Sequence, residues 1–282
     1  MSPIYGAIAC HISSRAALND LMVCFNSVLA QTKPLDLFCA SWSADGFLVE
    51  ITNKICLNFA GKFSSVGAAA KFLYQSGRCQ QFQHYLHIFR FIAESSCWND
   101  GTALVIFGDH DDRWAENRVE IMSSFALMSP KQVCVFPSYV DVATERERAC
   151  FEYWTAAVRF RVFADFFEGI DDRYFASTFC DCAFASYLKS RDPEYIERWR
   201  HMCDLYYYSG AHGGAGGSKN DCIVKEVEES LMRCYPSSDL PVDYSYENEI
   251  CGFTLLKSVK IDDLLVLKND ISKLDEYVVV TK

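Results

Sequence analysis

Three aspartates, Asp109, Asp111 and Asp112, follow directly after a short apolar run in the middle of the chain. The run, residues 104–107, has the length and β-branched content of a buried strand, so the carboxylates are expected at its carboxyl end, where open α/β sheets bind ligands. Acids this close together repel one another unless a cation or a donor-rich ligand lies between them. Oxygen clusters of this kind suit Mg²⁺ and Mn²⁺, which usually accompany phosphate. The alternative is a solvated acidic turn, against which the apolar run before the cluster and Trp114 after it both argue.

The overall composition limits the classes of protein that the chain can be. It has 282 residues, half of them hydrophobic, and a net charge of −10. Because nucleic-acid and anionic-membrane binders need clustered Lys and Arg, and the sequence has no basic stripe, we expect neither partner. The 14 cysteines lack the spacing of a disulfide scaffold or a zinc site, which favours reduced thiols and a cytoplasmic protein. The sequence shows no signal peptide and no apolar run of membrane-spanning length.

The elements that must position the aspartates begin with a β-α-β unit. A buried strand is expected over residues 5–10, then a helix that is capped by Ser13 or Ser14 and continues to residue 29, and then a second strand over 35–40. The helix is predicted because its apolar side chains recur at helical spacing. Such a unit pairs its two strands in parallel through a right-handed crossover.

Strand and helix continue to alternate up to the acid cluster and beyond it. An irregular stretch around Gly61 and Gly67 precedes a helix over 79–94, and the strand that carries the aspartates is followed by a helix over 117–128 and a strand over 132–136. This alternation predicts an α/β fold with a mostly parallel sheet and helices on both faces. The aspartates therefore belong to the ligand-binding edge of the sheet.

The second half of the chain is predicted to be mainly helical, with helices over 145–167, 182–189 and 195–202. A short strand over 205–208 precedes a glycine-rich loop, 209–218, which suits either a mobile lid or a plain linker. From about residue 222 the tail holds one helix, polar turns and a last apolar segment. We expect a main domain over 1–220 and an extension over 221–282 that packs on it.

Several of these motifs occur in the same order and at similar spacing in a known family. They are the turn that ends in Arg15, the helix end Ser-Val-Leu-Ala-Gln-Thr at 27–32, the turn Ser-Ala-Asp-Gly at 43–46 and the segment from Asp109 to Trp114. On these residues the chain resembles family 2 glycosyltransferases with the nucleotide-diphospho-sugar transferase (GT-A) fold. The resemblance covers the first half of the chain well and the second half loosely. It implies a three-layer α/β sandwich with a helical C-terminal part, and a catalytic role for domain 1–220.

The resemblance also implies a nucleotide-sugar site around the acid cluster. The Asp-x-Asp spacing of Asp109 and Asp111 implies ligands for Mn²⁺ or Mg²⁺, with Asp112 in support and Asp109 also close to the sugar nucleotide. Arg15 and Asp45 are implied as further nucleotide-sugar contacts. Family members usually carry one or two acids directly after the second strand, where this chain has an alanine and Ser41, so the identity of the nucleotide is less defined than the class of reaction.

Arg78 and Gln81 are two more candidate contacts for the diphosphate or the sugar. They lie at the start of the predicted helix 79–94, in a segment that resembles a variant seen in some family members. The unpaired N–H groups at a helix start favour anions, which supports this assignment. A merely solvated Arg78 is the alternative.

Two residues in the second half complete the expected site. Asp181 is a single acid in an apolar neighbourhood at a predicted helix start, and the resemblance places the acceptor-side carboxylate, which takes the proton from the attacking hydroxyl, at about this point. Asp171 and Asp172 are its rivals, although they look like a solvated turn. His212, inside the glycine-rich loop, matches the place where this fold often supplies a histidine to the metal or the diphosphate. An exposed loop histidine is the alternative.

The sequence therefore predicts a metal-dependent glycosyltransferase that moves a hexose or pentose from a nucleotide-diphosphate donor, UDP favoured, to a glycan or other hydroxyl acceptor with inversion. Two alternatives stay open. A sugar nucleotidyltransferase would normally carry a glycine-rich, basic loop after the first strand, and residues 10–15 contain no glycine. A non-catalytic carbohydrate-binding or scaffold protein with a decayed site is conceivable because of the missing acid near Ser41.

Overall fold

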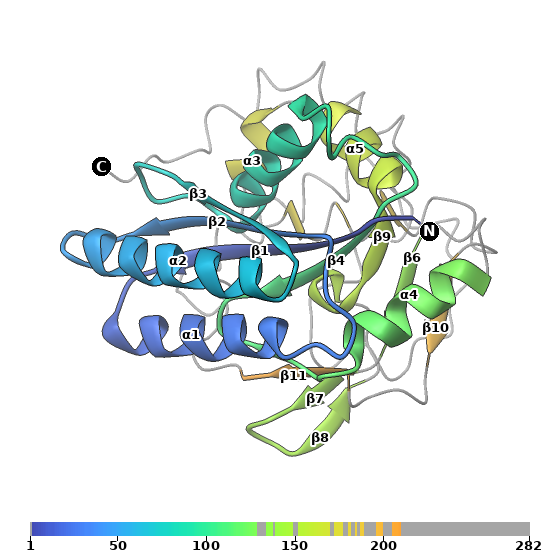
Figure 1. Cartoon of the computed structure of the whole chain (residues 1–282), viewed down its shortest axis with the longest axis horizontal. Helices are drawn as coiled ribbons and strands as arrows, with labels where there is room; N and C mark the ends of the chain where they lie inside the picture. Colours follow the sequence, from blue (N-terminus) through green and yellow to red (C-terminus); the bar gives the residue numbers. More distant parts are fainter. Residues whose placement is uncertain are drawn as a thin grey trace, which may run out of the picture.

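A mixed sheet of seven strands organises the described part of the chain, in the order β10-β6-β9-β4-β1-β2-β3 (Figure 1). The computed structural model describes residues 2–128, 134–137, 139–148, 152–169, 172–176, 180, 181, 184, 187, 188, 196–199 and 205–209. The strands of the sheet are β1 (Ile4–Ile12), β2 (Leu37–Ala44), β3 (Ala69–Tyr74), β4 (Leu104–Asp109), β6 (Cys134–Pro137), β9 (Ala157–Arg159) and β10 (Ile196–Trp199).

The sheet is parallel except around β9, which confirms the predicted mostly parallel arrangement. β1 pairs in parallel with β2 and β4, β2 with β3, and β6 with β10. β9 runs antiparallel between β4 and β6. The residues of β1 are buried almost throughout, as expected for a central strand that is covered on both faces.

Helices cover both faces of this sheet, so the fold has the predicted three layers. α1 (Arg15–Leu29) and α2 (Leu48–Ser65) lie together on one face, and α3 (Gln81–Glu94) and α5 (Phe160–Gly169) lie on the other (Figure 1). α4 (Arg118–Met128) packs against β4 and β6. Ser14 caps α1, because its hydroxyl accepts a hydrogen bond from the backbone N–H of Ala17 at 3.1 Å, as predicted for a helix that begins after a serine.

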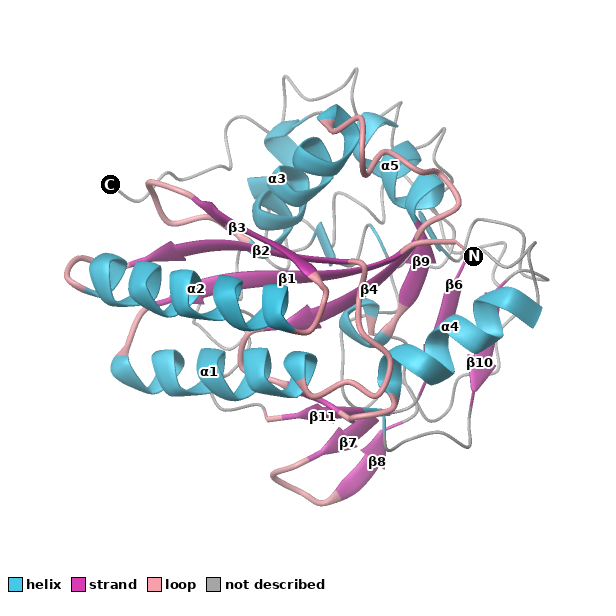
Figure 2. Ribbon diagram, viewed as in Figure 1, coloured by secondary structure: helices cyan, strands magenta, loops and turns pink. Residues whose placement is uncertain are grey.

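A second, smaller sheet lies beside the carboxyl end of β4 (Figure 2). It has the order β5-β11-β7-β8 and consists of β5 (Arg113–Trp114), β11 (Tyr206–Tyr208), β7 (Tyr139–Asp141) and β8 (Arg146–Arg148). β5 follows the acid cluster directly and pairs antiparallel with β11, with Tyr206 opposite Trp114. This pairing brings residues 206–209 next to the three aspartates.

The prediction of an irregular stretch around Gly61 and Gly67 is wrong, because the structure places α2 and β3 there. α2 buries a stripe that includes polar and small side chains, Leu48, Thr52, Cys56, Phe59 and Phe63, which weakens the apolar signal. β3 is an edge strand with half-buried residues on both sides. β3 therefore lacks the alternation of a core strand, whereas the stripe of α2 has helical spacing that the prediction missed.

Two predicted helices of the second half are also wrong. The segment 145–167 contains β8, the 3₁₀ turn η1 (Tyr153–Thr155) and β9 before α5 begins, and residues 196–199 form β10. The phenylalanines of α5 recur at helical spacing, and the prediction extended that pattern backwards into residues that pair with β4 and β6. Strand pairing with distant residues outweighed local helix propensity here.

Other predictions for the second half are confirmed where the structure describes them. β11 matches the strand expected over 205–208, and the described residues of 182–189 are helical. The glycine-rich loop from residue 210, the tail and the whole extension 221–282 lie outside the described residues, so the domain boundary stays a prediction. Within the described ranges, no helix combines the length and apolar content needed to cross a bilayer.

Gly108 tests how tightly β4 packs against the residue that follows the acid cluster. A Cβ at this position would lie 2.4 Å from Trp114 Nε1 and 2.9 Å from Ile8 Cδ1. We expect Gly108→Ala to lower the free energy of unfolding by about 1–3 kcal/mol through overpacking. Gly61→Ala is the control: Gly61 lies within α2, where a Cβ would meet nothing within 4 Å, so it should stabilise the protein by about 0.5–1 kcal/mol. Urea titration measures both, and equal effects of the two substitutions would contradict the packing described here.

Candidate functional site

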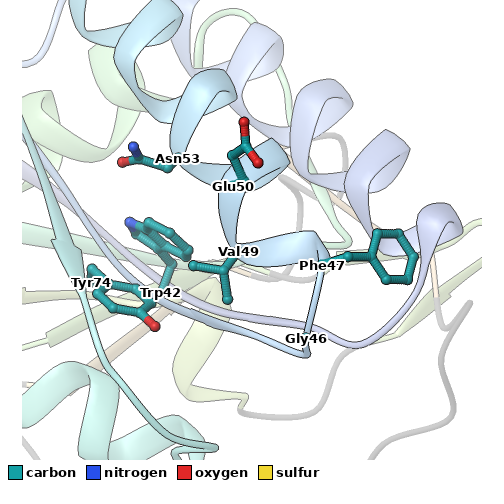
Figure 3. Close-up of a pocket in the computed structure, with 7 residues that line it drawn as sticks. All are labelled: Trp42, Gly46, Phe47, Val49, Glu50, Asn53 and Tyr74. Carbon is teal, nitrogen blue, oxygen red and sulfur yellow. The ribbon is translucent and has the colours of Figure 1, made fainter.

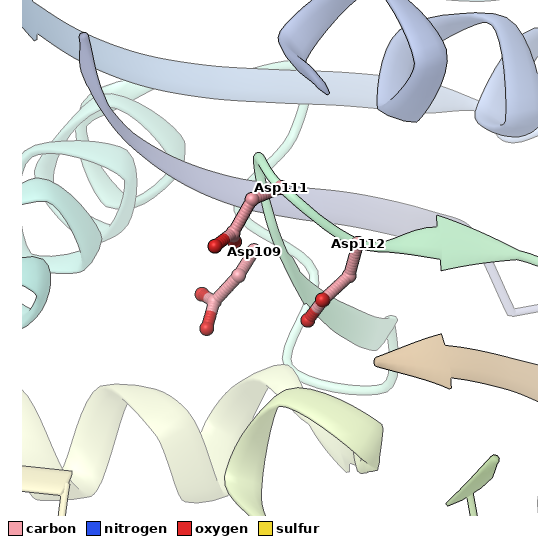
Figure 4. A group of neighbouring side chains, drawn as sticks. All are labelled: Asp109, Asp111 and Asp112. Carbon is pink, nitrogen blue, oxygen red and sulfur yellow. The ribbon is translucent and has the colours of Figure 1, made fainter. Parts of the chain in front are cut away.

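The three aspartates gather at the carboxyl end of β4, as the sequence predicts. Ligand oxygens of Asp109, Asp111 and Asp112 all lie within 4.8 Å of one another, and the carboxylates point to the same side of the turn between β4 and β5 (Figure 4). The backbone N–H of Asp112 donates to the carbonyl of Asp109 at 3.3 Å, which closes the turn. Asp109 and Asp111 are partly exposed, whereas Asp112 is buried.

Hydrogen-bond donors from two other elements contact Asp109. Gln81, the first residue of α3, donates from Nε2 to Asp109 Oδ1 at 2.6 Å. The Tyr153 hydroxyl lies 3.3 Å from Asp109 Oδ2. The structure therefore brings together Gln81 and Asp109, two residues that the sequence analysis named separately as nucleotide-sugar contacts, and Tyr153 is an addition that the sequence did not indicate.

Asp112 is held by the segment that β11 brings to the site. The Tyr206 hydroxyl donates to Asp112 Oδ2 at 2.7 Å, and the backbone N–H of Ser209 donates to Oδ1 at 2.9 Å. Tyr206 also accepts a hydrogen bond from the backbone N–H of Asp109 at 3.1 Å. One tyrosine hydroxyl thus ties the first and the last aspartate of the cluster together.

The environment of the cluster opposes its ionisation. Burial raises the pKa of Asp109 well above its ordinary value, and the charges of Asp112 and Asp111 raise it further. Burial, followed by the charge of Asp111, raises the pKa of Asp112 to about 8. A divalent cation among the three carboxylates would reverse this effect, since it favours the charged form. Three hard oxygen donors converging on one point fit Mg²⁺ or Mn²⁺.

A chain of polar side chains crosses the carboxyl ends of β1 and β2 on the α3 face. His11 Nδ1 lies 2.9 Å from Ser43 Oγ, which lies 3.2 Å from His84 Nε2. His84 Nδ1 lies 2.9 Å from Ser41 Oγ. Ser41, Ser43 and His84 are buried. Ser41 is one of the two positions where the sequence lacks the expected acid, so the structure places neutral hydrogen-bonding groups there.

His84 is neutral in the folded protein. Burial, with smaller contributions from the neighbouring histidines, lowers its pKa to about 3. Because a neutral imidazole has one donor and one acceptor nitrogen, one serine hydroxyl must donate to His84 and the other must accept from it. The hydrogen bonds of the chain therefore all run in one direction, which the tautomer of His84 sets.

The exposed end of this chain meets two predicted nucleotide-sugar residues. His11 Nε2 lies 3.9 Å from Asp45 Oδ1. Burial lowers the pKa of His11, the charge of Asp45 raises it, and the charge of Arg78 lowers it. Asp45 and Arg78 are both exposed. His11 and Asp45 thus lie side by side at one edge of the sheet, and the charge of Arg78 acts on the same imidazole.

The remaining predicted site residues are Arg15, Asp181 with its two rival acids, and His212. Arg15 is exposed as the first residue of α1. Asp181 is partly buried and helical, and its charge is among those that raise the pKa of Tyr153, after burial and the charge of Asp109. Since Tyr153 contacts Asp109, Asp181 belongs to the neighbourhood of the cluster. The rival Asp172 is exposed and pairs with Arg90. Asp171 and His212 lie outside the described residues.

A cavity of about 520 Å³ lies on the other face of β2. Trp42 and Tyr74 form one wall beside Val49, whereas Phe47 points away from them (Figure 3). Trp42 alternates with Ser41 and Ser43 along β2, so its side chain faces α2 while the serines face α3. The cavity is therefore separated from the polar chain by the sheet.

Comparison with solved structures gives the fold of the chain. S. aureus TarS 1–349 in complex with UDP-GlcNAc superimposes with a TM-score of 0.54 at 11% identity, over 100% of this chain and 76% of that chain. The same protein in complex with UDP gives 0.52 at 13% identity, over 74% of this chain and 60% of that one. The mannosyltransferase PcManGT from Pyrobaculum calidifontis, in complex with GDP-Man and Mn²⁺, gives 0.51 at 11% identity, over 83% and 64%.

This chain has a GT-A fold. It spans less than two thirds of the length of the TarS chain in the UDP complex and of PcManGT. No family model matches the sequence, and no curated protein matches it. The GT-A assignment confirms the fold that the sequence resemblance implies, whereas the roles of individual site residues rest on the geometry above.

Several groups around this GT-A site were missed or treated as structural in the sequence. Tyr153 and Tyr206 contact the aspartates from 44 and 94 residues away, and no local pattern marks such contacts. Ser41 and Ser43 lie two residues apart at the end of an otherwise apolar strand, and this spacing could have indicated a polar contact on one face of the sheet. Two polar residues with the same facing on a buried strand need a partner, and His84 provides it.

The neutral His84 predicts a pH dependence of stability. The pKa of His84 in the folded protein lies below the unfolded value of 6.5, so the unfolded chain binds the proton more strongly. The stability that this gives above pH 6.5 is lost as the pH falls from 6.5 towards the folded pKa of about 3. The contribution is at most about 1.4 kcal/mol per pH unit. His84→Gln should flatten the fall in unfolding free energy between about pH 6.5 and about pH 4.5, measured by urea titration. His87→Gln is the comparison: burial also lowers the pKa of this half-buried histidine of α3, but by less, so His87→Gln should flatten the slope less than His84→Gln does. A wild-type slope in His84→Gln would show that His84 is not neutral in the fold.

Proposed function

We propose that this protein is a glycosyltransferase that uses a divalent cation, Mn²⁺ or Mg²⁺, and a nucleotide-diphosphate sugar, with UDP as the favoured nucleotide. The observation that carries the proposal is the convergence of Asp109, Asp111 and Asp112 at the carboxyl end of β4 in a GT-A fold. TarS structures contain UDP or UDP-GlcNAc, and PcManGT contains GDP-Man and Mn²⁺. These complexes support a nucleotide-sugar donor for the present chain.

The donor would lie across the edge where β1, β2 and β4 end. At the nucleoside end, Asp45 accepts hydrogen bonds and His11 is oriented by Ser43. Arg78 and Arg15 add positive charge for the diphosphate. Nearer the sugar, Gln81 holds Asp109 through its amide N–H, so the same aspartate can accept from a sugar hydroxyl while its position stays fixed.

The three aspartates are the residues that would hold the cation, with His212 as a further candidate ligand. When bound, the cation neutralises negative charge on the leaving diphosphate. The chain's own contribution is to keep the carboxylates together despite their repulsion. Gln81 and Tyr153 do so for Asp109, and Tyr206 with the backbone of Ser209 does so for Asp112.

Transfer then consists of one displacement at the anomeric carbon. The acceptor hydroxyl oxygen forms a bond to this carbon, the bond to the diphosphate oxygen breaks with its electron pair, and the hydroxyl proton passes to the carboxylate of Asp181. Attack from the side opposite the leaving group inverts the configuration.

The acceptor is a glycan or another hydroxyl compound, and the transferred group is a hexose or pentose. The cysteine content supports a cytoplasmic setting, where thiols stay reduced.

Asp111→Ala tests the role of the acid cluster. We expect it to lower the Mn²⁺-dependent affinity for UDP by more than about 100-fold, since it removes a direct ligand rather than a supporting one. Isothermal titration of UDP with and without Mn²⁺ measures this. The melting temperature should stay the same or rise, because one of three repelling carboxylates is gone. Glu116→Ala, at an exposed acid soon after the cluster, controls for net charge. Wild-type Mn²⁺ dependence in Asp111→Ala would refute the metal assignment.

Asp181→Asn tests the proton acceptor. Donor binding should stay within about twofold of wild type, while sugar transfer falls by about 10²–10⁴-fold, the contribution typical of a general base. Transfer is measured as UDP release in the presence of a hydroxyl acceptor, after a screen of nucleotide sugars for slow donor hydrolysis. Asp172→Asn, at the exposed rival acid that pairs with Arg90, is the matched control. Full transfer by Asp181→Asn, or its loss in Asp172→Asn, would move the role to another residue.

A further inference from the structure

Arg118 is a fully buried cation next to the acid cluster. It is the first residue of α4, and its side chain has no exposed surface. Nη2 donates to the backbone carbonyls of Trp154 and Thr155, each at 3.1 Å. None of the ion pairs in the described part of the chain involves Arg118. A guanidinium this deeply buried usually has a carboxylate partner. Other contacts must therefore stabilise the buried charge of Arg118.

Two aromatic rings enclose the guanidinium. Its Cζ lies 4.3 Å from the ring centroid of Trp114 and 4.5 Å from that of Tyr206. A desolvated cation is attracted to the faces of such rings. Nε and Nη1 are buried and have no hydrogen-bond partner among the described residues, so the rings are the main contacts of these two nitrogens.

Both rings belong to the structure that carries the acid cluster. Trp114 lies two residues after Asp112 and faces Tyr206 across the pairing of β5 with β11. The Tyr206 hydroxyl donates to Asp112 and accepts from the backbone N–H of Asp109. Trp154 stacks on the Tyr206 ring with centroids 4.9 Å apart. Arg118 therefore contacts the ring whose hydroxyl fixes Asp112.

Arg118 also brings a positive charge close to the ring that contacts Asp112. Burial lowers the pKa of Arg118 itself to about 10, so the guanidinium stays charged at neutral pH. A permanent positive charge thus lies behind the ring that contacts the buried carboxylate.

We propose that Arg118 is a positioning residue of the metal site: stacked between Trp114 and Tyr206, it fixes the Tyr206 hydroxyl on Asp112 and so holds this carboxylate ready for a divalent cation. The proposal rests on the proposed function, because it assumes that the acid cluster binds the cation. Arg118 is too deeply buried to contact substrate, and its effect passes through Tyr206. Residues that orient metal ligands in this way commonly contribute about 10–100-fold to metal affinity.

The test is Mn²⁺ affinity of the full chain, followed by the electron paramagnetic resonance signal of free Mn²⁺, with the melting temperature measured in parallel. Tyr206→Phe, which removes only the hydroxyl, and Arg118→Met should each weaken Mn²⁺ binding by about tenfold. Because both act on Asp112 by one route, the double variant should bind Mn²⁺ about as weakly as either single variant. Additive losses in the double variant would overturn the route through Tyr206.

Two further variants separate positioning from charge and from general destabilisation. Arg118→Lys keeps the charge without the planar stack, so Mn²⁺ affinity should stay reduced; recovery to the wild-type value would overturn the positioning role. This milder variant also serves if Arg118→Met does not fold. Arg113→Met is the matched control, because Arg113 is exposed, lies next to Trp114 on β5, and has its Cζ 5.3 Å from the ring centroid of Tyr207. This variant should bind Mn²⁺ like wild type, and a loss equal to that of Arg118→Met would overturn the proposal.

The same data distinguish failure of this inference from failure of the proposed function. If the wild-type chain binds no Mn²⁺, the metal site itself is absent, and both proposals fall. If the wild-type chain binds Mn²⁺, and Arg118→Met and Arg118→Lys both bind it with wild-type affinity, the acid cluster keeps its role. Arg118 is then a structural cation only.

Discussion

The mutual repulsion of three carboxylates at the end of one buried strand is the constraint on which the site depends. Their oxygens lie within 4.8 Å of one another, and burial makes the ionisation of Asp109 and Asp112 costly. Hydrogen-bond donors from separate elements contact two of these carboxylates. Asp109 is contacted by Gln81 of α3 and Tyr153 of η1, and Asp112 by Tyr206 of β11 and the backbone of Ser209. Such groups hold the carboxyl groups in place without forming ion pairs with them, so that their oxygens can still bind a cation, which favours the charged form.

This constraint explains several features of the surrounding fold. β11 pairs with β5 and so carries Tyr206 to the cluster, and Trp114 packs so closely on β4 that only glycine fits at position 108. Arg118 stacks on Trp114 and Tyr206 from the core side. Acid cluster, small sheet and buried cation therefore form one packed unit, in which a shift of any part moves the carboxylates.

The sequence could predict the features that depend on neighbouring residues. The acid cluster, the first β-α-β unit and the N-cap of α1 follow from local patterns, and the structure confirms them. β9 could not be recognised, because its antiparallel place between β4 and β6 depends on pairing with distant strands. Tyr206 was placed correctly on a short strand, but its contact with Asp112 depends on the pairing of β5 and β11. The polar chain through Ser41, Ser43 and His84 could not be predicted either, because its prediction requires knowledge of which face of the sheet α3 covers.

The most direct test of the account is a crystal structure of the protein soaked with Mn²⁺ and UDP, with anomalous differences collected to locate the metal. The account predicts an anomalous peak coordinated by oxygens of the Asp109, Asp111 and Asp112 cluster and by the diphosphate of UDP, with Tyr206 still hydrogen-bonded to Asp112. Aspartates that remain free of metal, or a diphosphate bound away from the end of β4, would contradict it.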